Sequence, residues 1–386
     1  MLSLLAICVL PLFRAYAGLI KTVPAPSNTT YTPPNANCVD YEAPITISTQ
    51  GFNFDAPRWS DNFGLTDFVS VISTRPSANF SAPISVSVDL EGNYTISATF
   101  CSPKARNSTS STVLLLTHGG GYDGRYWNSG FEPETYNFVQ FAISQGYSVF
   151  NYDRLGIGNS SKLSGFVSQA SMHVEVLNEL AMRIKAGQYT DNIGVPTKLV
   201  LVGHSMGSAY TNSLLVNAPE IADAAVLTGL AFTQDVGTVA ESFSLRVAAQ
   251  QDKAWNELDE GFTTWDSIYN NVNAFFKAPT YDIEAVKYAE SVKAPFAILD
   301  ILTFLAIPFN ATQFKGPTLV ISGEYDFLLC GGYCPGVNEE PSASNFNGSS
   351  AFKADIVPKA GHGLNFHTNA PETYATIFEF LKDHGL

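Results

Sequence analysis

The sequence predicts an α/β fold in which a mostly parallel central sheet carries helices on both faces. The first observation is a series of short apolar runs without polar alternation, which is typical of strands covered on both sides. These runs are Val113–Leu116, Tyr147–Tyr152, Leu199–Val202, Ala224–Leu227 and Thr318–Ile321. The second observation is that helix-compatible stretches, such as Ser171–Lys185 and Ser205–Val216, separate the runs. This alternation favours a parallel sheet between two helical layers.

The chain begins with the features of a secretory signal. An apolar run, Leu2–Phe13, precedes small residues at Ala15 and Ala17 that fit a signal-peptidase site, so residues 1–17 are expected to be removed. A membrane anchor is the alternative interpretation, but the run is shorter than the roughly 20 residues that span a bilayer. We therefore expect a secreted, extracellular protein without stable membrane insertion.

Sequons and cysteines support the same compartment. Asn-x-Ser/Thr sequons occur at Asn28, Asn79, Asn93, Asn107, Asn159, Asn310 and Asn347. The even set of cysteines that remains after the signal suits an oxidising environment. Of the three possible pairings we favour Cys330 with Cys334, because two glycines between them let so short a ring close, and Cys38 with Cys101. Free buried thiols are the alternative.

Composition and charge exclude several classes of partner. Hydrophobic residues make up 45% of the 386-residue chain, so a sizeable core can form without metals. A formal net charge of −14 repels nucleic acid and anionic membrane surfaces, and no basic cluster offsets it. We expect no nucleic-acid partner, and the oligomeric state stays open.

The segment after the signal predicts an extended arm and an antiparallel hairpin. Val23–Asn37 is rich in Pro, Asn and Thr, which indicates an arm and not a folded element. Two alternating segments, Ile84–Val88 and Tyr94–Phe100, flank Glu91–Asn93 in the pattern of a hairpin with one solvated face. We expect both strands at an edge of the sheet.

Residues 231–312 interrupt the strand–helix alternation with a segment that has no clear strand but many aromatic residues. We interpret it as an inserted helical cap, whose aromatic residues mostly form its own core while a few line a pocket. The predicted organisation is a signal peptide (1–17), the first part of the core with its N-terminal arm (18–230), the cap (231–312) and the second part of the core (313–386).

A nucleophile motif lies where a predicted strand meets a predicted helix. The strand Lys198–Val202 runs into Gly203–Gly207, which reads Gly-His-Ser-Met-Gly with Ser205 at its centre. A sharp turn of this kind needs glycines beside the serine, and it exposes the hydroxyl at a helix N-terminus. Because a serine hydroxyl is a poor nucleophile at neutral pH, the chain should also contain a base and an acid that orients it.

The acid and the base are expected in two later loops. Asp326 follows the apolar strand Thr318–Ile321 and is the expected orienting acid, with Glu324 as the reserve. His362, flanked by Gly361 and Gly363 after another predicted strand, is the expected base. The competing histidines are His118, His204 and His367.

A glycine-rich loop supplies candidate donors for an oxyanion hole. His118–Trp127 follows the strand that ends at Thr117 and contains three consecutive glycines able to present bare amides. One donor is expected from Met206, just after the nucleophile, and the other from Gly119–Gly121, with Gly120 favoured. A phosphate-binding role fails because no Lys-Ser/Thr pair follows.

Another loop, Asp153–Ser160, has glycines but not the spacing of a dinucleotide-binding fingerprint. We interpret it as a structural turn beside the active site, in which Asp153 and Arg154 pair locally.

Together, the motifs around His118, Asp153, Ser205, Asp326 and His362 resemble those of the α/β-hydrolase superfamily, from about Val113 to the C-terminus. With its signal, sequons and acidic charge, the chain looks like the secreted fungal branch of that superfamily. The resemblance implies an α/β-hydrolase fold, a cap over the pocket, and acyl transfer through an acyl-enzyme. It implies no metal and no organic cofactor.

The sequence therefore predicts a secreted serine hydrolase that cleaves carboxylic ester or lactone bonds of apolar small molecules. The aromatic cap and the scarcity of charged residues in the pocket loops favour apolar substrates. An acyltransferase and a binding protein of the same fold are the alternatives, and lipase, peptidase, carbon–carbon hydrolase and cofactor-free peroxidase chemistry share the same triad. An epoxide hydrolase or dehalogenase would need Asp in place of Ser205.

Overall fold

A computed structural model describes residues 31–73, 82–105, 111–232, 236–337 and 339–386. The signal peptide and the sequons at Asn28, Asn79 and Asn107 lie outside these residues. In the described part, an eight-stranded sheet has the order β1-β2-β4-β3-β5-β6-β10-β11. Its parallel block consists of β3 (Thr112–Thr117), β4 (Ser148–Tyr152), β5 (Lys198–His204), β6 (Ala224–Thr228), β10 (Thr318–Gly323) and β11 (Phe352–Val357). The predicted fold class is confirmed.

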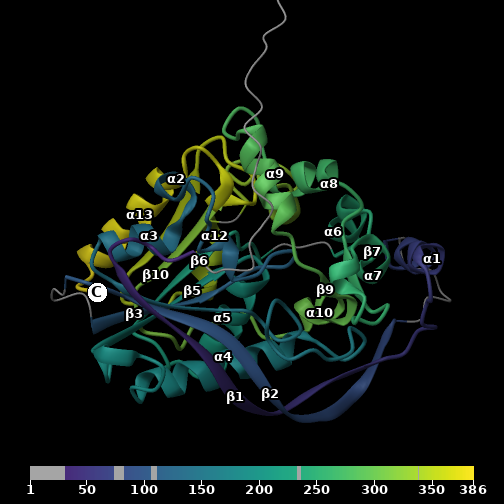
Figure 1. Cartoon of the computed structure of the whole chain (residues 1–386), viewed down its shortest axis with the longest axis horizontal. Coiled ribbons are helices and arrows are strands. Elements are labelled where there is room, and N and C mark those ends of the chain that lie inside the picture. The colour runs from purple at the N-terminus through teal and green to yellow at the C-terminus, as the bar shows by residue number, and fades with distance from the viewer. Residues whose placement is uncertain (1–30, 74–81, 106–110, 233–235, 338) are drawn as a thin grey trace, which may run out of the picture.

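Two long strands, β1 (Ala36–Phe54) and β2 (Ile84–Pro103), form an antiparallel ribbon at one edge of the sheet and extend beyond it toward α1 (Figure 1). The predicted hairpin is wrong, because both alternating segments belong to β2, which runs through Gly92 without turning. Gly92 pairs with Ile47 of β1 in a ladder that also places Cys38 opposite Cys101. Disulfides join Cys38 to Cys101 and Cys330 to Cys334, as predicted.

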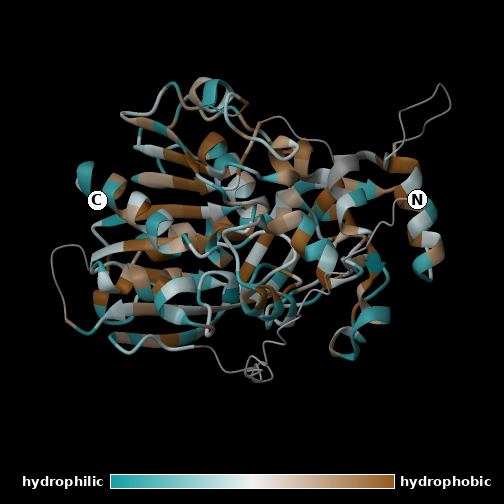
Figure 2. Cartoon of the chain, turned by 90° about the horizontal axis from the view of Figure 1, so that it is seen from above, coloured by the Kyte–Doolittle hydropathy of each residue, from teal (hydrophilic) through white to brown (hydrophobic). Residues whose placement is uncertain are grey.

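Helices cover both faces of the sheet. Along β3 and β5, alternate residues enter different cores: Leu114 and Val200 pack with one layer, and Leu115 and Leu201 with the other. In Figure 2 the hydrophobic colour concentrates on the strands of this sheet. One layer contains α3 (Phe138–Ser144) and α13 (Ala370–Asp383), and the other contains α4 (Ala170–Lys185) and α5 (Met206–Asn217). The shorter elements of the core are η2 (Gly124–Tyr126), α2 (Pro133–Tyr136), η3 (Asp191–Ile193), α11 (Phe327–Cys330), α12 (Glu339–Asn345) and η6 (Leu364–Phe366).

The described residues of the segment 231–312 lie beside the sheet, and we refer to them as the cap (Figure 1). The expectation that it holds no strand is wrong, because a three-stranded antiparallel sheet forms from β7 (Arg246–Val247), β8 (Phe262–Thr264) and β9 (Phe296–Ala297). These strands are too short to show a periodic pattern. The cap helices are α6 (Val236–Phe243), α7 (Ala248–Gln251), η4 (Lys253–Trp255), α8 (Ile268–Phe275), α9 (Ile283–Ser291), α10 (Ile298–Thr303) and η5 (Phe304–Ala306).

An N-terminal helix, α1 (Asn62–Ser73), also packs against the cap. The Asn62 side chain accepts a hydrogen bond from the Val247 amide at 2.8 Å, and the Trp59 indole donates one to the Glu260 carbonyl at 2.7 Å. The cap is therefore tied to the segment that connects β1 to β2.

Candidate active site

Ser205 occupies a sharp turn between β5 and α5. Its backbone has φ 55° and ψ −121°, a strained conformation for a residue with a side chain. The flanking glycines are required by close contacts: a Cβ on Gly203 would lie 2.5 Å from the Ser208 Cα, and one on Gly207 would lie 2.2 Å from the Thr117 carbonyl oxygen. The turn leaves Ser205 partly exposed at the carboxyl edge of the parallel sheet.

The structure brings together the predicted acid and base. Asp326 Oδ2 lies 2.6 Å from His362 Nδ1, and both side chains are fully buried. The second carboxylate oxygen of Asp326 accepts the Leu329 amide at 3.0 Å, so it is fixed as the N-cap of α11. The reserve acid, Glu324, accepts the Lys359 amide instead. Asp326 is therefore the carboxylate that contacts His362.

This contact orients the imidazole of His362. Because Nδ1 faces a carboxylate, it carries the proton, and Nε2 is left as an acceptor. Among the described residues, Nε2 of His362 is buried without a hydrogen-bond partner. The imidazole thus has one nitrogen available for a proton from another group.

Gly229, at the end of β6, is a site residue that sequence reasoning missed. Its φ is 55°, and a Cβ there would lie 3.0 Å from His204 Cε1 and 3.1 Å from His362 Cε1. Gly229 follows the carboxyl end of a parallel strand, where functional loops gather. This position in the sequence could have identified it as a site residue. Because Gly229 has no side chain, the imidazoles of His204 and His362 can lie close to each other beside it.

His367, a competing base, has a supporting position. Its Nε2 accepts the Gly361 amide at 2.9 Å and the Lys277 amide at 3.2 Å, and its Nδ1 donates to the Gly363 carbonyl at 3.0 Å. Burial lowers the pKa of His367 to about 4. His367 therefore stays neutral and holds the backbone on both sides of His362.

The other two competing histidines are also buried. His204 stacks on Tyr126 with ring centroids 4.2 Å apart, and its Nδ1 lies 3.0 Å from the Thr228 hydroxyl. Burial, together with the neighbouring His362, holds the pKa of His204 well below its usual range. His118 Nδ1 lies 2.9 Å from the Gly119 carbonyl oxygen, and its Nε2 accepts the Arg154 amide at 3.0 Å. Neither histidine contacts Asp326 in the described contacts.

The predicted oxyanion-hole donors lie beside Ser205. A Cβ on Gly119 would lie 2.9 Å from the Ser205 Cβ, and one on Gly120 would lie 2.8 Å from the Met206 sulfur. Met206 is the first residue of α5, so its amide belongs to the first turn, whose amides have no partner within the helix. The glycine-rich loop and the helix N-terminus thus face the same serine.

A small apolar cavity of about 60 Å³ opens at Ser205. Four of the cap aromatics line it, in line with the expectation that a few would. Its lining residues are Gly120, Ser205, Met206, Phe243, Phe275, Phe296, Ile301, Phe304, Leu328 and Leu329. The hydroxyl of Ser205 is the only side-chain hydrogen-bonding group in this lining.

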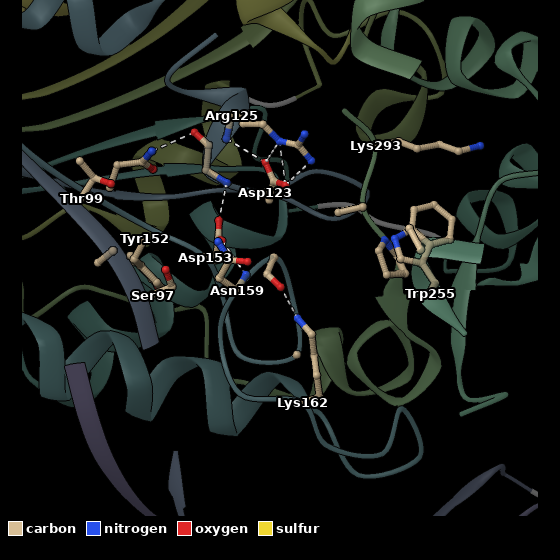
Figure 3. Close-up of a pocket in the computed structure, with 18 of the residues that line it drawn as sticks. Ser97, Thr99, Asp123, Arg125, Tyr152, Asp153, Asn159, Lys162, Trp255 and Lys293 are labelled. Carbon is tan, nitrogen blue, oxygen red and sulfur yellow. Dashed lines mark hydrogen bonds and ion pairs between the residues drawn. The ribbon is translucent and has the colours of Figure 1, made fainter. Parts of the chain in front are cut away.

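A larger cavity, of about 370 Å³, lies between the cap and the β2–β4 edge and does not include Ser205 (Figure 3). Asp153, in its wall, accepts the amides of Gly124 and Asn159 at 3.0 Å each. Burial and the nearby Asp123 raise the pKa of Asp153 to about 6. No residue lines both cavities, and charged side chains such as Asp123, Arg125 and Lys162 line this one but not the Ser205 cavity.

The prediction that Asp153 pairs with Arg154 is wrong. Arg154 turns away from Asp153 and forms an ion pair at 2.9 Å with Asp300 of α10. A partner 146 residues away gives no local signal in the sequence.

Within the described residues, no group of three or more His, Cys, Asp or Glu side chains could hold a metal ion. In the same part of the chain, no helix is long and apolar enough to cross a bilayer.

Comparison with known proteins shows the family. Residues 113–377 match the alpha/beta hydrolase family, so the chain belongs to it. A comparison with curated proteins finds no match.

Solved structures confirm the fold. An esterase from Exiguobacterium antarcticum is 17% identical with a TM-score of 0.52, over 75% of this chain and 96% of that one. A thermophilic esterase from Thermogutta terrifontis is 17% identical with a TM-score of 0.51, over 76% and 95%. A putative non-heme bromoperoxidase, BpoC from Mycobacterium tuberculosis, is 15% identical with a TM-score of 0.50, over 75% and 97%. At these identities the similarity concerns the fold.

Proposed function

We propose that the protein is a serine hydrolase that cleaves carboxylic ester or lactone bonds through an acyl-enzyme at Ser205. The observation that carries the proposal is the buried pair of Asp326 and His362, with Nδ1 held at 2.6 Å and Nε2 left without a partner in the described structure. Ser205 stands on a strained turn at the same edge of the sheet. This is the arrangement that nucleophilic acyl transfer needs.

In the proposed reaction the Ser205 hydroxyl attacks the substrate carbonyl carbon while Nε2 of His362 takes its proton. Asp326 stabilises the imidazolium that forms. The amides of Met206 and Gly120 stabilise the oxyanion, a contribution of about 3 to 4 kcal/mol per donor. The tetrahedral intermediate collapses, the alkoxide leaves with the proton from His362, and a water molecule then releases the acid by the same steps.

The cavity at Ser205 supports small apolar acyl groups as substrates. Its volume of about 60 Å³ has room for a short alkyl chain, and it offers no charged or amide side chain to a polar acyl group. A hydrophobic pocket of this kind discriminates by size, with about 1 to 3 kcal/mol for each methylene that does not fit. Esters and lactones with short acyl groups are therefore the proposed substrates.

We also propose that the protein is secreted, as in the secreted fungal branch of the superfamily. The disulfides Cys38–Cys101 and Cys330–Cys334 support an oxidising compartment. The described sequon residues Asn93, Asn159, Asn310 and Asn347 are all exposed, so each is accessible to glycosylation.

Hydrolysis of p-nitrophenyl esters from acetate to octanoate tests the function. We expect the highest kcat/KM among the short esters, and no turnover above background with Ser205→Ala. Ser213→Ala is the matched control, because Ser213 lies on the same helix and its buried hydroxyl has no partner in the described structure. Addition of alcohol acceptors distinguishes hydrolysis from acyl transfer by the products. Unchanged turnover in Ser205→Ala would contradict the proposal.

A further inference from the structure

A buried ion pair connects the cap to the core beneath the active site. Arg154, in the loop after β4, and Asp300, in α10 of the cap, are almost completely buried, with Arg154 Nη1 at 2.9 Å from Asp300 Oδ2. Tyr210 of α5 donates to Asp300 Oδ1 at 2.5 Å, and His173 Nε2 of α4 lies 3.4 Å from Oδ2. Asp300 thus holds together side chains from three elements of the core.

The carboxyl of Asp300 is ionised in this setting. Burial opposes ionisation, but the neighbouring His173 and Arg154 and the hydrogen bond from Tyr210 hold the pKa of Asp300 well below its usual range. The pair is therefore a charged one in a site from which water is excluded, where losing one partner strands the other charge.

Arg154 also contacts the oxyanion loop. Its Nη2 donates to the Gly119 carbonyl oxygen at 3.3 Å, and the same oxygen lies 2.9 Å from His118 Nδ1. His118 Nε2 accepts the backbone amide of Arg154 at 3.0 Å, so the ring proton is on Nδ1, which donates to Gly119. The Gly119 carbonyl is thus held by two donors, both dependent on the position of Arg154.

Holding this carbonyl determines where the next amide points. In a trans peptide the C=O and the following N–H point in opposite directions, so the Gly120 amide points away from Arg154. Gly120 lines the Ser205 cavity and borders Met206, which places its amide on the side of the proposed oxyanion. A peptide between two glycines has little intrinsic preference for one orientation, because glycine accepts both signs of φ.

We propose that Arg154 and Asp300 are positioning residues that orient the Gly119–Gly120 peptide, so that cap docking through Asp300 completes the oxyanion hole. The inference rests on the proposed function, because it assigns these residues a part in the same reaction. A purely structural ion pair would affect stability and leave stabilisation of the oxyanion unchanged.

The test compares two inhibitors that share one short alkyl chain. A trifluoromethyl ketone forms a bond from Ser205 Oγ to its carbonyl carbon, the C=O π electrons move to the oxygen, and the hydroxyl proton passes to His362. The product carries an oxyanion, which hydrogen bonds from the oxyanion hole would stabilise. The matched carboxamide binds without forming an oxyanion. The ratio of the two inhibition constants therefore measures how well the protein stabilises an oxyanion, independently of how well the cavity binds the alkyl chain.

For Asp300→Asn we expect the trifluoromethyl ketone to lose about 10- to 100-fold in affinity, a part of what deleting an oxyanion donor costs, while the carboxamide changes little. kcat should fall by a similar factor with KM nearly constant. Arg154→Lys retains the buried charge but loses the second arm that reaches Gly119, and it should show the same selective loss. If Asp300→Asn does not fold, the inhibitor ratio of Arg154→Lys tests the inference instead.

Tyr210→Phe is the matched control. It removes the hydrogen bond to Asp300 and the one that Arg154 Nη1 donates to the Tyr210 hydroxyl at 3.3 Å, but it keeps the ring beneath the guanidinium. Arg154 retains its contacts with Asp300 and Gly119, so thermal stability should fall while the inhibitor ratio stays at the wild-type value. An unchanged ratio in folded Asp300→Asn or Arg154→Lys overturns the inference. If the wild-type protein itself does not prefer the trifluoromethyl ketone, the proposed function fails instead.

Discussion

Asp326 Oδ2 lies 2.6 Å from Nδ1 of His362, with neither side chain exposed to solvent. A carboxylate in this position fixes the imidazole with its proton on Nδ1 and leaves Nε2 as an acceptor, which in the proposed reaction takes the Ser205 proton. An amide at the same place can present its NH₂ group to Nδ1 and favour the opposite tautomer.

We therefore predict that Asp326→Asn lowers kcat by about 10³- to 10⁴-fold with little change in KM. Steady-state kinetics on a short p-nitrophenyl ester measures the effect. Glu324→Gln is the control, because Glu324 accepts a backbone amide in the same loop and does not contact His362. Equal losses in the two variants would remove Asp326 from its proposed role.

We predict that activity requires glycine at position 229, because a side chain there would displace the imidazole of His204 or His362. In Gly229→Ala the new methyl group would lie about 3 Å from both His204 and His362, so one of the rings must move. We expect kcat to fall at least about 100-fold, because small displacements of catalytic groups have effects of this size.

The control for Gly229 is Gly194→Ala, which separates strain from contact. Gly194 also has a positive φ, of 67°, but a Cβ there meets nothing within 4 Å. Both variants should lose about 1 to 2 kcal/mol of stability in urea denaturation, since each places a side chain in the left-handed region. Full activity in folded Gly229→Ala would show that the two rings do not need this space.

His367 makes stability depend on pH. Its pKa is about 4 in the native state against 6.5 in the unfolded chain, so between these values the unfolded chain binds a proton that the native protein does not. Native stability is complete above about pH 6.5 and falls as the pH drops toward 4, by up to about 1.4 kcal/mol per pH unit from this group.

Urea denaturation at several pH values between 4 and 7 checks this dependence. His367→Gln should lose stability at pH 7, because the three backbone hydrogen bonds are altered, and should show a slope smaller by about one proton. Asp153, whose raised pKa of about 6 acts in the opposite direction, is present in both proteins and cancels in the comparison. Identical slopes would mean that His367 can be protonated without loss of its contacts.

The size of the Ser205 cavity is predicted to set the preferred acyl chain. Phe304 lines it from η5, so Phe304→Ala should move the optimum toward longer p-nitrophenyl esters and change the ratio of kcat/KM values by about 10-fold or more. Tyr269→Ala removes an exposed ring from the same cap and should leave the profile unchanged. A profile insensitive to Phe304 would place the acyl group elsewhere.

The sequence predicted the parallel block of the sheet well, because buried strands there appear as continuous apolar runs. Ser205 and Asp326 could be proposed because each follows such a run, and His362 because it lies between two glycines after a predicted strand. The carboxyl ends of parallel strands lie at one edge of a sheet, and it is at this edge that the structure brings Asp326 into contact with His362.

What the sequence did not reveal depends on contacts between distant segments. Arg154 was paired with its neighbour Asp153, although its partner is Asp300 in the cap. Strand β1 was missed even though Ala43, Ile45 and Ile47 stand at alternate positions and are buried. Its position opposite β2 also explains why the predicted hairpin does not form.

The measurement that tests the central claim most directly is labelling of the purified protein with a fluorophosphonate, followed by digestion and mass spectrometry. The reagent requires an activated serine, a working base and an oxyanion hole together. The account predicts modification at Ser205 alone, retained in Ser213→Ala and lost in Ser205→Ala. Modification of another serine, or no modification of folded protein, would contradict it.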